Sequence, residues 1–375
     1  MKLSGLKVID VSWFYPGPFL TMALADHGAE VIKVEPPEGD PGRRIAPMDE
    51  RTSFFFRNLN RGKKSVVLDL KREEGRAALL RLCDGADVMV ESFRPGVAKR
   101  LGIDYEAVKA RNPRIVYCSI TAFGQDGPYA ARPAHNLALE ALTGVLSLSL
   151  GDDGRPAVPG IPIADLVSAL QGLAGVLMAL LRRTETGRGD RLDIAMHDSL
   201  FAGCANVIGW ALAEGRAPIV KHQRTTGGSA FYRIYDTRDG RALVLAGQEA
   251  KFVHTLLDAL GRPDLEALCA RGPGPHQQPV IEFLRATFRT RSLSEWMDFL
   301  TRLDVCFAPV NTLPEALDDP NVRARGMLRT DAAGRVHIAP AIRFHDEPAQ
   351  PVLREPLLGE HTAEVLGAAE RCRLP

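Results

Sequence analysis

The chain has almost no excess charge of either sign and few aromatic side chains. Its formal net charge is +1 over 375 residues, and aromatic residues make up only 6% of it. Nucleic-acid binding surfaces need clustered positive charge, and binding of single strands adds stacked aromatic rings. The composition, 45% hydrophobic and 25% charged, is that of an ordinary globular protein. We therefore expect neither nucleic acid nor a membrane among the partners.

Signals for export, disulfides and metal sites are also missing. The first residues contain no apolar signal core, and the most apolar stretch, Leu166 to Leu181, is too short and too often interrupted to cross a membrane. None of the six cysteines forms a C-x-x-C pair, and the nine histidines show no spacing typical of zinc ligands. We expect a cytoplasmic protein with reduced cysteines and no metal.

Short β-rich runs alternate with helical patterns through the first half of the chain. Leu6 to Val11 predicts a strand, Pro16 to Ala25 a helix that Gly28 ends, and Glu30 to Glu35 the next strand. Further strands are expected over 65–69, 87–91, 114–119 and 191–196, with helices beginning at 73 and 105 and another over 198–214. This alternation predicts a mostly parallel, doubly wound α/β sheet. The G-x-G-x-x-G fingerprint of dinucleotide binding does not follow the first strand.

The length of the chain allows two domains. Paired strands over 231–236 and 242–246, joined by Asp239-Gly240, predict a smaller α/β domain in the second half. We expect a large domain over 1–200, a linker helix over 201–224 and the small domain over 225–330. Residues 331–375 are expected to return to the large domain.

Three polar residues stand where helices are expected to begin. Asp165 precedes the long apolar run, where a carboxylate could be a nucleophile or a proton-transfer base, or could only cap the helix. His135 follows a proline turn and could act as a base near neutral pH, or could serve as a cap or a core residue. Glu249 follows Gly247, and an acid there could also simply stabilise a helix start. Pattern alone leaves these alternatives open.

A basic run, Arg57 to Ser65, precedes one of the expected strands and contains Gly62. Several cations and a close backbone approach suit a phosphate-rich ligand, and Arg43, Arg44 and Arg100 could join them. The alternative is a charged loop in solvent.

Taken in order, many segments resemble the family III CoA-transferases, the CaiB/BaiF family, which includes α-methylacyl-CoA racemases. The resemblance covers nearly the whole chain. The matching segments are Leu6–Val11, Gly17-Pro18, Ala25–Glu35, Asn60–Ser65, Glu91–Gly96, Phe123–Pro128, Thr186–Gly189 and Gly359–Thr362.

The resemblance implies an intertwined homodimer. Each chain would have a Rossmann-like large domain and a smaller α/β domain, with active sites between the large domain of one chain and the small domain of the other. Coenzyme A would enter as part of the substrate, with no permanently bound cofactor. Ser92 stands where the family commonly has asparagine. The implied CoA-binding positions are Tyr15, Pro16, Arg43 or Arg44, Ser92, Phe93, Val97 and Arg100.

The resemblance also implies a catalytic role for Asp165. In a transferase, Asp165 would form acyl-anhydride and thioester intermediates while CoA passes from an acyl-CoA to a free carboxylic acid. In a racemase, His135 and Asp165 would move the α-proton of a 2-methylacyl-CoA, with Glu249 assisting. The segments Ala134-His135-Asn136 and Ala164-Asp165-Leu166 depart from the racemase pattern of Gly-His-Asp and Gly-Asp-Phe. Transfer is the leading hypothesis, and a CoA-binding protein without catalysis is the alternative of another class.

Overall fold

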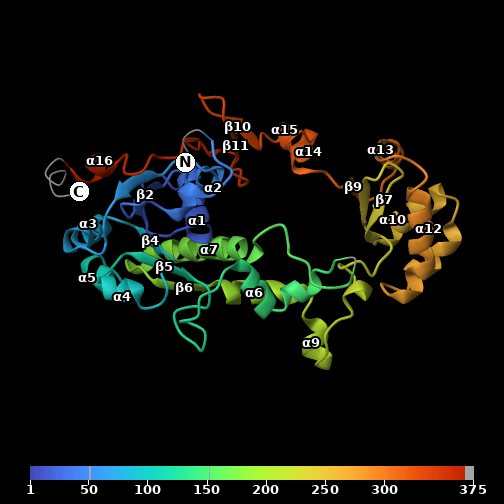
Figure 1. Ribbon diagram of the computed structural model, residues 1–375, viewed down its shortest axis with the longest axis horizontal. Helices are drawn as coiled ribbons and strands as arrows, with labels where there is room; N and C mark the ends of the chain where they lie inside the picture. The colour runs from blue at the N-terminus through green and yellow to red at the C-terminus, as the bar shows by residue number, and fades with distance from the viewer. Residues whose placement is uncertain (50–51, 152, 368–375) are drawn as a thin grey trace. The chain divides into compact units, whose positions relative to one another are not determined.

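The computed structural model describes residues 1–49, 52–151 and 153–367 (Figure 1). They form two compact units, each described here by itself. The first unit contains the described residues of Met1–Val145, Pro159–Cys204 and Pro320–Pro375, and the second contains those of Leu146–Val158 and Ala205–Asp319. Residues 146–158 thus belong with the second unit, although the expected boundaries put them in the large domain.

A parallel six-stranded sheet organises the first unit, as the alternation of strands and helices predicted. Its order is β3-β2-β1-β4-β5-β6, that of doubly wound nucleotide-binding folds. The register pairs Val8 with Val31 and Val88, and Ile9 with Ile32 and Met89. The strands are β1 Lys7–Asp10, β2 Glu30–Glu35, β3 Lys64–Val67, β4 Val88–Glu91, β5 Val116–Thr121 and β6 Arg191–Ala195.

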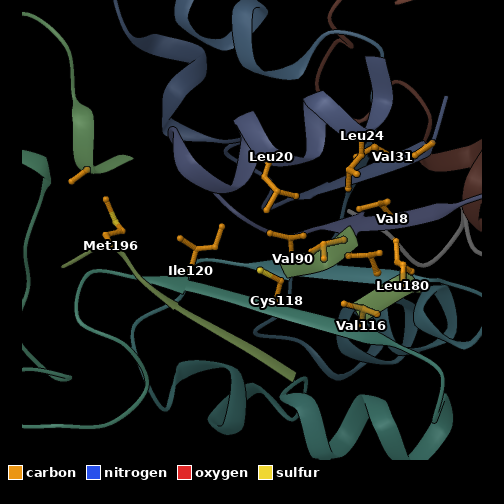
Figure 2. Packing of buried hydrophobic residues seen from close by; sticks show 14 of the residues in the cluster. Val8, Leu20, Leu24, Val31, Val90, Val116, Cys118, Ile120, Leu180 and Met196 are labelled. Atoms are coloured by element: carbon orange, nitrogen blue, oxygen red, sulfur yellow. The ribbon is translucent and has the colours of Figure 1, made fainter. Parts of the chain in front are cut away.

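Helices cover both faces of this sheet because alternate strand residues are apolar on both sides. Val8, Val31 and Val90 point to one face, where Figure 2 shows them packed with Leu20, Leu24 and Leu180. Ile9, Ile32 and Met89 point to the other face. The first face is covered by α1 Pro16–Asp26, α7 Ile163–Thr186 and α8 Met196–Ala202, and the second by α3 Glu73–Asp84, α4 Val97–Leu101, α5 Tyr105–Arg111 and α16 Thr362–Leu366.

The first unit is completed by shorter elements and by the C-terminal segment. Ser65 on β3 donates its backbone N–H to the His361 ring at 3.2 Å, and Val67 donates to the Thr362 hydroxyl at 3.0 Å. These bonds attach residues near the end of the described chain to the edge of the sheet. The remaining elements are the 3₁₀ turn η1 Pro41–Arg44, α2 Phe54–Asn60, α6 Asn136–Leu142, α15 Pro320–Ala324, β10 Leu328–Thr330 and β11 Val336–Ile338.

The second unit contains a three-stranded sheet in the order β7-β8-β9. β7 Tyr232–Asp236 and β8 Ala242–Ala246 pair antiparallel as predicted, and β9 Phe307–Pro309 pairs with β8. Its core gathers Leu243, Leu245, Leu256, Phe288 and Trp296. The helices are α9 Gly209–Glu214, α10 Ala250–Ala259, α11 Glu266–Cys269, α12 Gln278–Phe288, α13 Leu293–Leu300 and α14 Leu313–Leu317.

Two expectations about helices were wrong. The helix predicted over 198–214, and with it the linker helix over 201–224, is broken: α8 ends at Ala202, a 3₁₀ turn spans Gly203–Asn206, and α9 begins only at Gly209. Glycine has low helix propensity, and the boundary between the two units falls in this turn.

The second error concerns the length of the apolar helix. α7 has 24 residues, so by length and composition it could cross a membrane, and it is the one such helix among the described residues. This is weak evidence for a membrane span, because a core helix passes the same test. α7 packs on α1, α8, β5 and β6 (Figure 1).

All five cysteines within the described residues are free. Cys83, Cys118 and Cys204 are buried, while Cys269 is partly exposed and Cys306 is exposed. Cys372 lies outside the described residues. In that part of the chain, no three His, Cys, Asp or Glu side chains gather in a way that could hold a metal ion.

Candidate active site

The connections after β1 and β4 meet at one point of the large sheet. The two strands are neighbours, yet the chain leaves β1 toward β2 and returns through β4 on the other side. In doubly wound sheets, ligands bind outside the carboxyl ends of the strands at such a switch point. Trp13 donates its backbone N–H to Ser92 Oγ at 3.0 Å, and the rings of Trp13 and Phe93 meet edge to face at 6.5 Å. These contacts fix the two connections to each other.

A cavity of about 520 Å³ lies at this edge, and residues that follow four of the strands line it. Arg44 follows β2, and Phe93 and Val97 follow β4, so three of the predicted CoA-binding residues share its wall. The lining also includes Trp13 after β1 and Lys71 after β3. Three acidic residues, Glu35, Glu38 and Asp69, also line the cavity, and Arg43 pairs with Glu35. The apolar walls can accommodate a nucleotide, with Arg44 and Lys71 as the cations for its phosphate groups.

The other predicted CoA-binding residues lie nearby in the sequence but do not line this cavity. Tyr15 is the N-cap of α1 and stacks on Phe19 at 5.6 Å, and Pro16 is buried at the first position of that helix. Ser92 holds the backbone of Trp13, and Arg100 is an exposed residue of α4. Their role in CoA binding stays a prediction.

The two candidate arginines are in different environments. Arg43 donates two hydrogen bonds of 2.7 Å to the Glu35 carboxylate, and its guanidinium lies 3.8 Å from the centre of the Phe56 ring. Arg44 is exposed and, within the described part of the chain, donates only to the Glu38 carbonyl, at 3.3 Å. The Arg43 guanidinium is therefore already engaged, while Arg44 remains available to a ligand.

The basic run Arg57 to Ser65 is neither a phosphate-binding loop nor a solvated loop, so both interpretations of it were wrong. Arg57, Arg61 and Lys63 are at most 3% exposed. Arg61 binds the Asp26 carboxylate, with bonds of 3.0 and 2.5 Å, and Lys63 Nζ lies 2.9 Å from Asp10. Cations that are buried and paired with carboxylates cannot bind a ligand in solvent.

Gly17 brings the start of α1 against the turn that follows β1. A Cβ atom there would lie 2.2 Å from the Ser12 hydroxyl, so no other residue fits without a shift of the backbone. Phe14, just before α1, has φ of 62°, which makes it the one non-glycine residue with positive φ within the described chain. Backbone strain of this kind is often found at functional sites.

Asp165 is the third residue of α7 and is half-buried. Pro162, not Asp165, is the N-cap, and the Asp165 side chain makes no capping bond, so the capping interpretation of Asp165 was wrong. Within the described residues, its carboxyl oxygens have no hydrogen-bond or ion-pair partner. Burial raises the pKa of Asp165 to about 6; the Glu140 charge acts in the same direction, and His135 opposes it. A carboxylate held this way is ionised at neutral pH and poorly solvated.

His135 and Tyr15 lie close enough to Asp165 for charges to interact. His135 is the exposed N-cap residue of α6, and its ring meets that of Phe14 edge to face at 6.5 Å. Burial, and then the charge of Asp165, raise the pKa of Tyr15. The structure therefore brings Asp165, His135 and the start of α1 to one region of the first unit.

Glu249 belongs to the second unit. It is the exposed N-cap residue of α10, and its side chain makes no capping bond. Its neighbour Gln248 donates to the Arg224 carbonyl at 3.2 Å. The structure thus places Glu249 at a helix start of the second unit and Asp165 at a helix start of the first.

The sequence interpretation missed Asn136 and Glu140. Asn136 Oδ1 accepts the backbone N–H of Ala164 at 2.9 Å, and its Nδ2 donates to Glu140 Oε1 at 2.6 Å. An Asn and a Glu four residues apart at a helix start could have suggested a side-chain pair. Nothing in the sequence showed that this pair holds the residue before Asp165.

The sequence is similar to proteins of a known family over nearly its whole length. The model of the CoA-transferase family III matches residues 3–362. A succinate–glutarate CoA-transferase of Agrobacterium fabrum is 34% identical, with 98% of this chain and 96% of the relative covered. The α-methylacyl-CoA racemase of Homo sapiens is 32% identical, with 98% and 93% covered.

Among solved structures, a CaiB/BaiF family protein from Brucella suis has a TM-score of 0.85 at 32% identity. The alignment covers 97% of this chain and 98% of that one. The similarity therefore extends through both units.

Proposed function

The chain belongs to CoA-transferase family III, and we propose that it moves CoA from an acyl-CoA thioester to a free carboxylic acid by covalent catalysis at Asp165. One observation carries this proposal: Asp165 is a half-buried carboxyl group with no cation partner in the described chain. The prediction of CoA-transferase function agrees with the relatives found.

The proposed reaction needs four acyl transfers. The Asp165 carboxylate attacks the thioester carbonyl, and the CoA thiolate leaves as a mixed anhydride forms. The thiolate then attacks the Asp165 carbonyl, which releases the first acid and leaves CoA bound to the enzyme as a thioester. The acceptor carboxylate attacks this thioester, giving a second anhydride and the thiolate again. Attack of the thiolate on the acyl carbon gives the new acyl-CoA and restores Asp165.

The environment of Asp165 suits the first step. With a pKa of about 6, the group is ionised at neutral pH, yet burial leaves it weakly solvated. A weakly solvated carboxylate attacks a carbonyl more readily than one bound to a cation. The charge of Asp165 acts on Tyr15, the N-cap of α1. In the first turn of that helix Pro16 and Pro18 have no N–H and the Phe19 N–H bonds to the Tyr15 carbonyl, so we assign the Gly17 N–H to a developing oxyanion.

We assign the nucleotide end of CoA to the cavity at the switch point. Arg44 supplies a cation for its phosphate groups, and Phe93 and Val97 supply apolar contacts. Tyr15, Pro16, Ser92 and Arg100 are assigned to CoA through the family resemblance alone. CoA is part of the substrate, and no other cofactor is proposed.

The acceptor is a carboxylic acid, and a short dicarboxylate is the first to test. The relative from Agrobacterium fabrum is named for succinate and glutarate, both of which carry two carboxylates. The expected assay is exchange of CoA from succinyl-CoA to a panel of acids, followed by mass spectrometry.

We further propose that the active protein is an interlocked homodimer in which Glu249 of the partner's small domain completes the site. One face of α7 supports dimerisation, because it exposes 40–70% of each of four large apolar side chains to solvent in the single chain. These side chains are Leu170, Leu177, Met178 and Leu181. Sedimentation should give a dimer for the wild type and a monomer for the variant Met178→Glu/Leu181→Glu. A wild-type monomer would contradict the proposal.

Racemisation of a 2-methylacyl-CoA is the second candidate. It is favoured by the interaction of His135 with Asp165, since two groups are needed to remove and return the α-proton. The human racemase among the relatives supports it too. Incubation of 2-methylacyl-CoA in deuterated water, without any acceptor acid, separates the two: racemisation puts deuterium at the α-carbon, and transfer does not.

The proposed intermediate can be observed directly. We expect peptide mass spectrometry, after incubation with acyl-CoA and a rapid quench, to find CoA bound as a thioester to the peptide that contains Asp165. Added hydroxylamine should convert this group to a hydroxamate. An enzyme that turns over without any adduct on this peptide would rule out covalent catalysis at Asp165.

A further inference from the structure

Glu140, on α6, is a buried acid that the proposed reaction does not use. Its side chain is 0% exposed. Oε1 accepts one hydrogen bond, from Asn136, whereas Oε2 has no partner among the described residues although it is buried. A buried carboxyl oxygen without a partner is costly, so such groups call for an explanation.

A short chain of hydrogen bonds links Glu140 to the residue before Asp165. Glu140 holds the Asn136 amide, and Asn136 Oδ1 accepts the N–H of Ala164 at 2.9 Å. The first N–H groups of a helix have no partner inside the helix. Asn136 therefore supplies the partner that the Ala164 N–H lacks, and so orients the first turn of α7.

We propose that Glu140 is a positioning residue of the active site: it holds the backbone beside Asp165 through Asn136, and its negative charge acts on the Asp165 carboxyl group. This proposal deepens the function proposed above and rests on it. The Glu140 charge acts to raise the pKa of Asp165, in addition to burial.

The other ionisable groups around α7 do not compensate this charge. His135 at the start of α6 opposes it, and Tyr15 at the start of α1 is a weak acid. On α8, His197 lies 3.1 Å from Asp198 and is paired with it. On β6, Arg191 and Asp193 act on Glu91. His135 and Glu140 are thus the two charges that act on Asp165, in addition to burial.

This arrangement fits nucleophilic catalysis. A negative charge nearby makes the Asp165 carboxylate more basic, and basicity increases its reactivity toward a thioester carbonyl. The backbone bond through Asn136 fixes the first turn of α7, on which Asp165 lies. An ordinary structural role would account for the hydrogen bond to Asn136 but would give Glu140 no effect on the protonation of Asp165.

Glu140→Gln separates the two roles. Glutamine keeps the shape and can still accept the Asn136 bond, but it has no charge. We expect the acid limb of the pH profile of kcat/KM to move to lower pH. For each enzyme, kcat/KM at pH 5 is expressed as a fraction of its own plateau value. This fraction should be at least about twofold larger in the variant than in wild type. An unchanged acid limb in a folded, active variant would overturn the charge role.

Asn136→Ala is the matched variant, because it removes the backbone contact and leaves the Glu140 charge. We expect kcat to fall about tenfold or more, with the KM for acyl-CoA within about twofold of wild type. If kcat is retained, the backbone role is wrong. Thermal melting of both variants checks that they fold.

A carbon-13 NMR titration of the Asp165 carboxyl, assigned by its loss in Asp165→Asn, tests the charge role without turnover. We expect the midpoint to be lower in Glu140→Gln than in wild type. Equal midpoints would overturn this inference alone. A shifted midpoint in a protein that transfers no CoA would uphold it and overturn the proposed function instead.

Discussion

Asp10 and Asp165 are two acids of the first unit with opposite environments. Asp10 accepts bonds from the Ser12 backbone at 2.9 Å, the Thr21 hydroxyl at 2.7 Å and Lys63 at 2.9 Å, and also from the Ser12 hydroxyl. Asp165 has no such partner in the described chain. Burial alone would raise the pKa of both, yet Lys63 and Lys33 reverse the effect and hold the pKa of Asp10 well below its usual range.

The difference shows that partners, more than burial, determine what a carboxyl group can do. The Asp10 charge is neutralised, so it holds the turn after β1 in place but is a poor nucleophile. The Asp165 charge is not neutralised, so it is costly for folding but available to react. Both acids interact with α1 or its N-cap: Asp10 accepts a bond from Thr21, and the charge of Asp165 acts on Tyr15.

Loss of a cation from the Asp10 network should have the largest effect on stability. All three Lys63 donors are used, at 2.9 Å each, to Asp10, the Pro18 carbonyl and Asn60. Lys63→Met should lower the free energy of unfolding by about 3–5 kcal/mol, because it leaves a buried charge unpaired. Lys64→Met is the control: its partners Glu30 and Glu364 are exposed, and we expect a loss of at most about 1 kcal/mol. If urea denaturation shows equal losses of unfolding free energy for the two variants, the proposed difference between buried and exposed cations is wrong.

Arg43 and Arg44 also differ in whether their charge is paired with a buried carboxylate. Arg43→Ala removes the guanidinium that bonds to the buried Glu35, which keeps the charge of Lys33 nearby. We expect the free energy of unfolding to fall by about 2–4 kcal/mol. Arg44→Ala should leave stability within about 0.5 kcal/mol and weaken CoA binding roughly three- to tenfold. Calorimetry of both variants with CoA decides the matter. If CoA binding is weaker only in Arg43→Ala, then Arg43 and not Arg44 binds CoA, which contradicts the assignment.

Substitution of Asp165 is expected to change stability less, and to increase it. Its folded-state pKa of about 6 lies above the ordinary value of 3.8, so the native state keeps a proton that the unfolded chain loses between about pH 4 and pH 6. Stability from this group is present at low pH and is lost as pH rises through that window. Asp165→Asn should therefore be more stable than wild type by about 1–2 kcal/mol at pH 8, and near equal at pH 4. A variant less stable than wild type at pH 8 would show that the carboxylate has a stabilising partner.

The sequence predicted the regular part of the fold well. The strand over Glu30–Glu35 has the predicted limits, and α1 begins at Pro16 as expected, since proline favours the first turn of a helix. Local pattern determines such elements. The buried pairs could not be predicted in this way, because Lys63 and Asp10 are 53 positions apart.

The candidate site was predictable only in part. The family resemblance pointed to Asp165 and His135, and the structure brings their charges within reach of each other. The resemblance did not reveal Asn136 and Glu140, because their role depends on a contact with a helix that begins near Ala164, 28 positions after Asn136. Arg57 to Ser65 was misinterpreted because a basic run looks the same in sequence whether its partners lie in a ligand or in the core.

The most direct measurement is CoA transfer by Asp165→Ala, with CoA affinity measured on the same sample. We predict that the rate falls by at least about 1000-fold, because the reacting carboxyl group is gone, while the Kd for CoA stays within a few-fold of wild type. Transfer at a near-native rate in a folded variant would contradict the assignment of Asp165 as nucleophile.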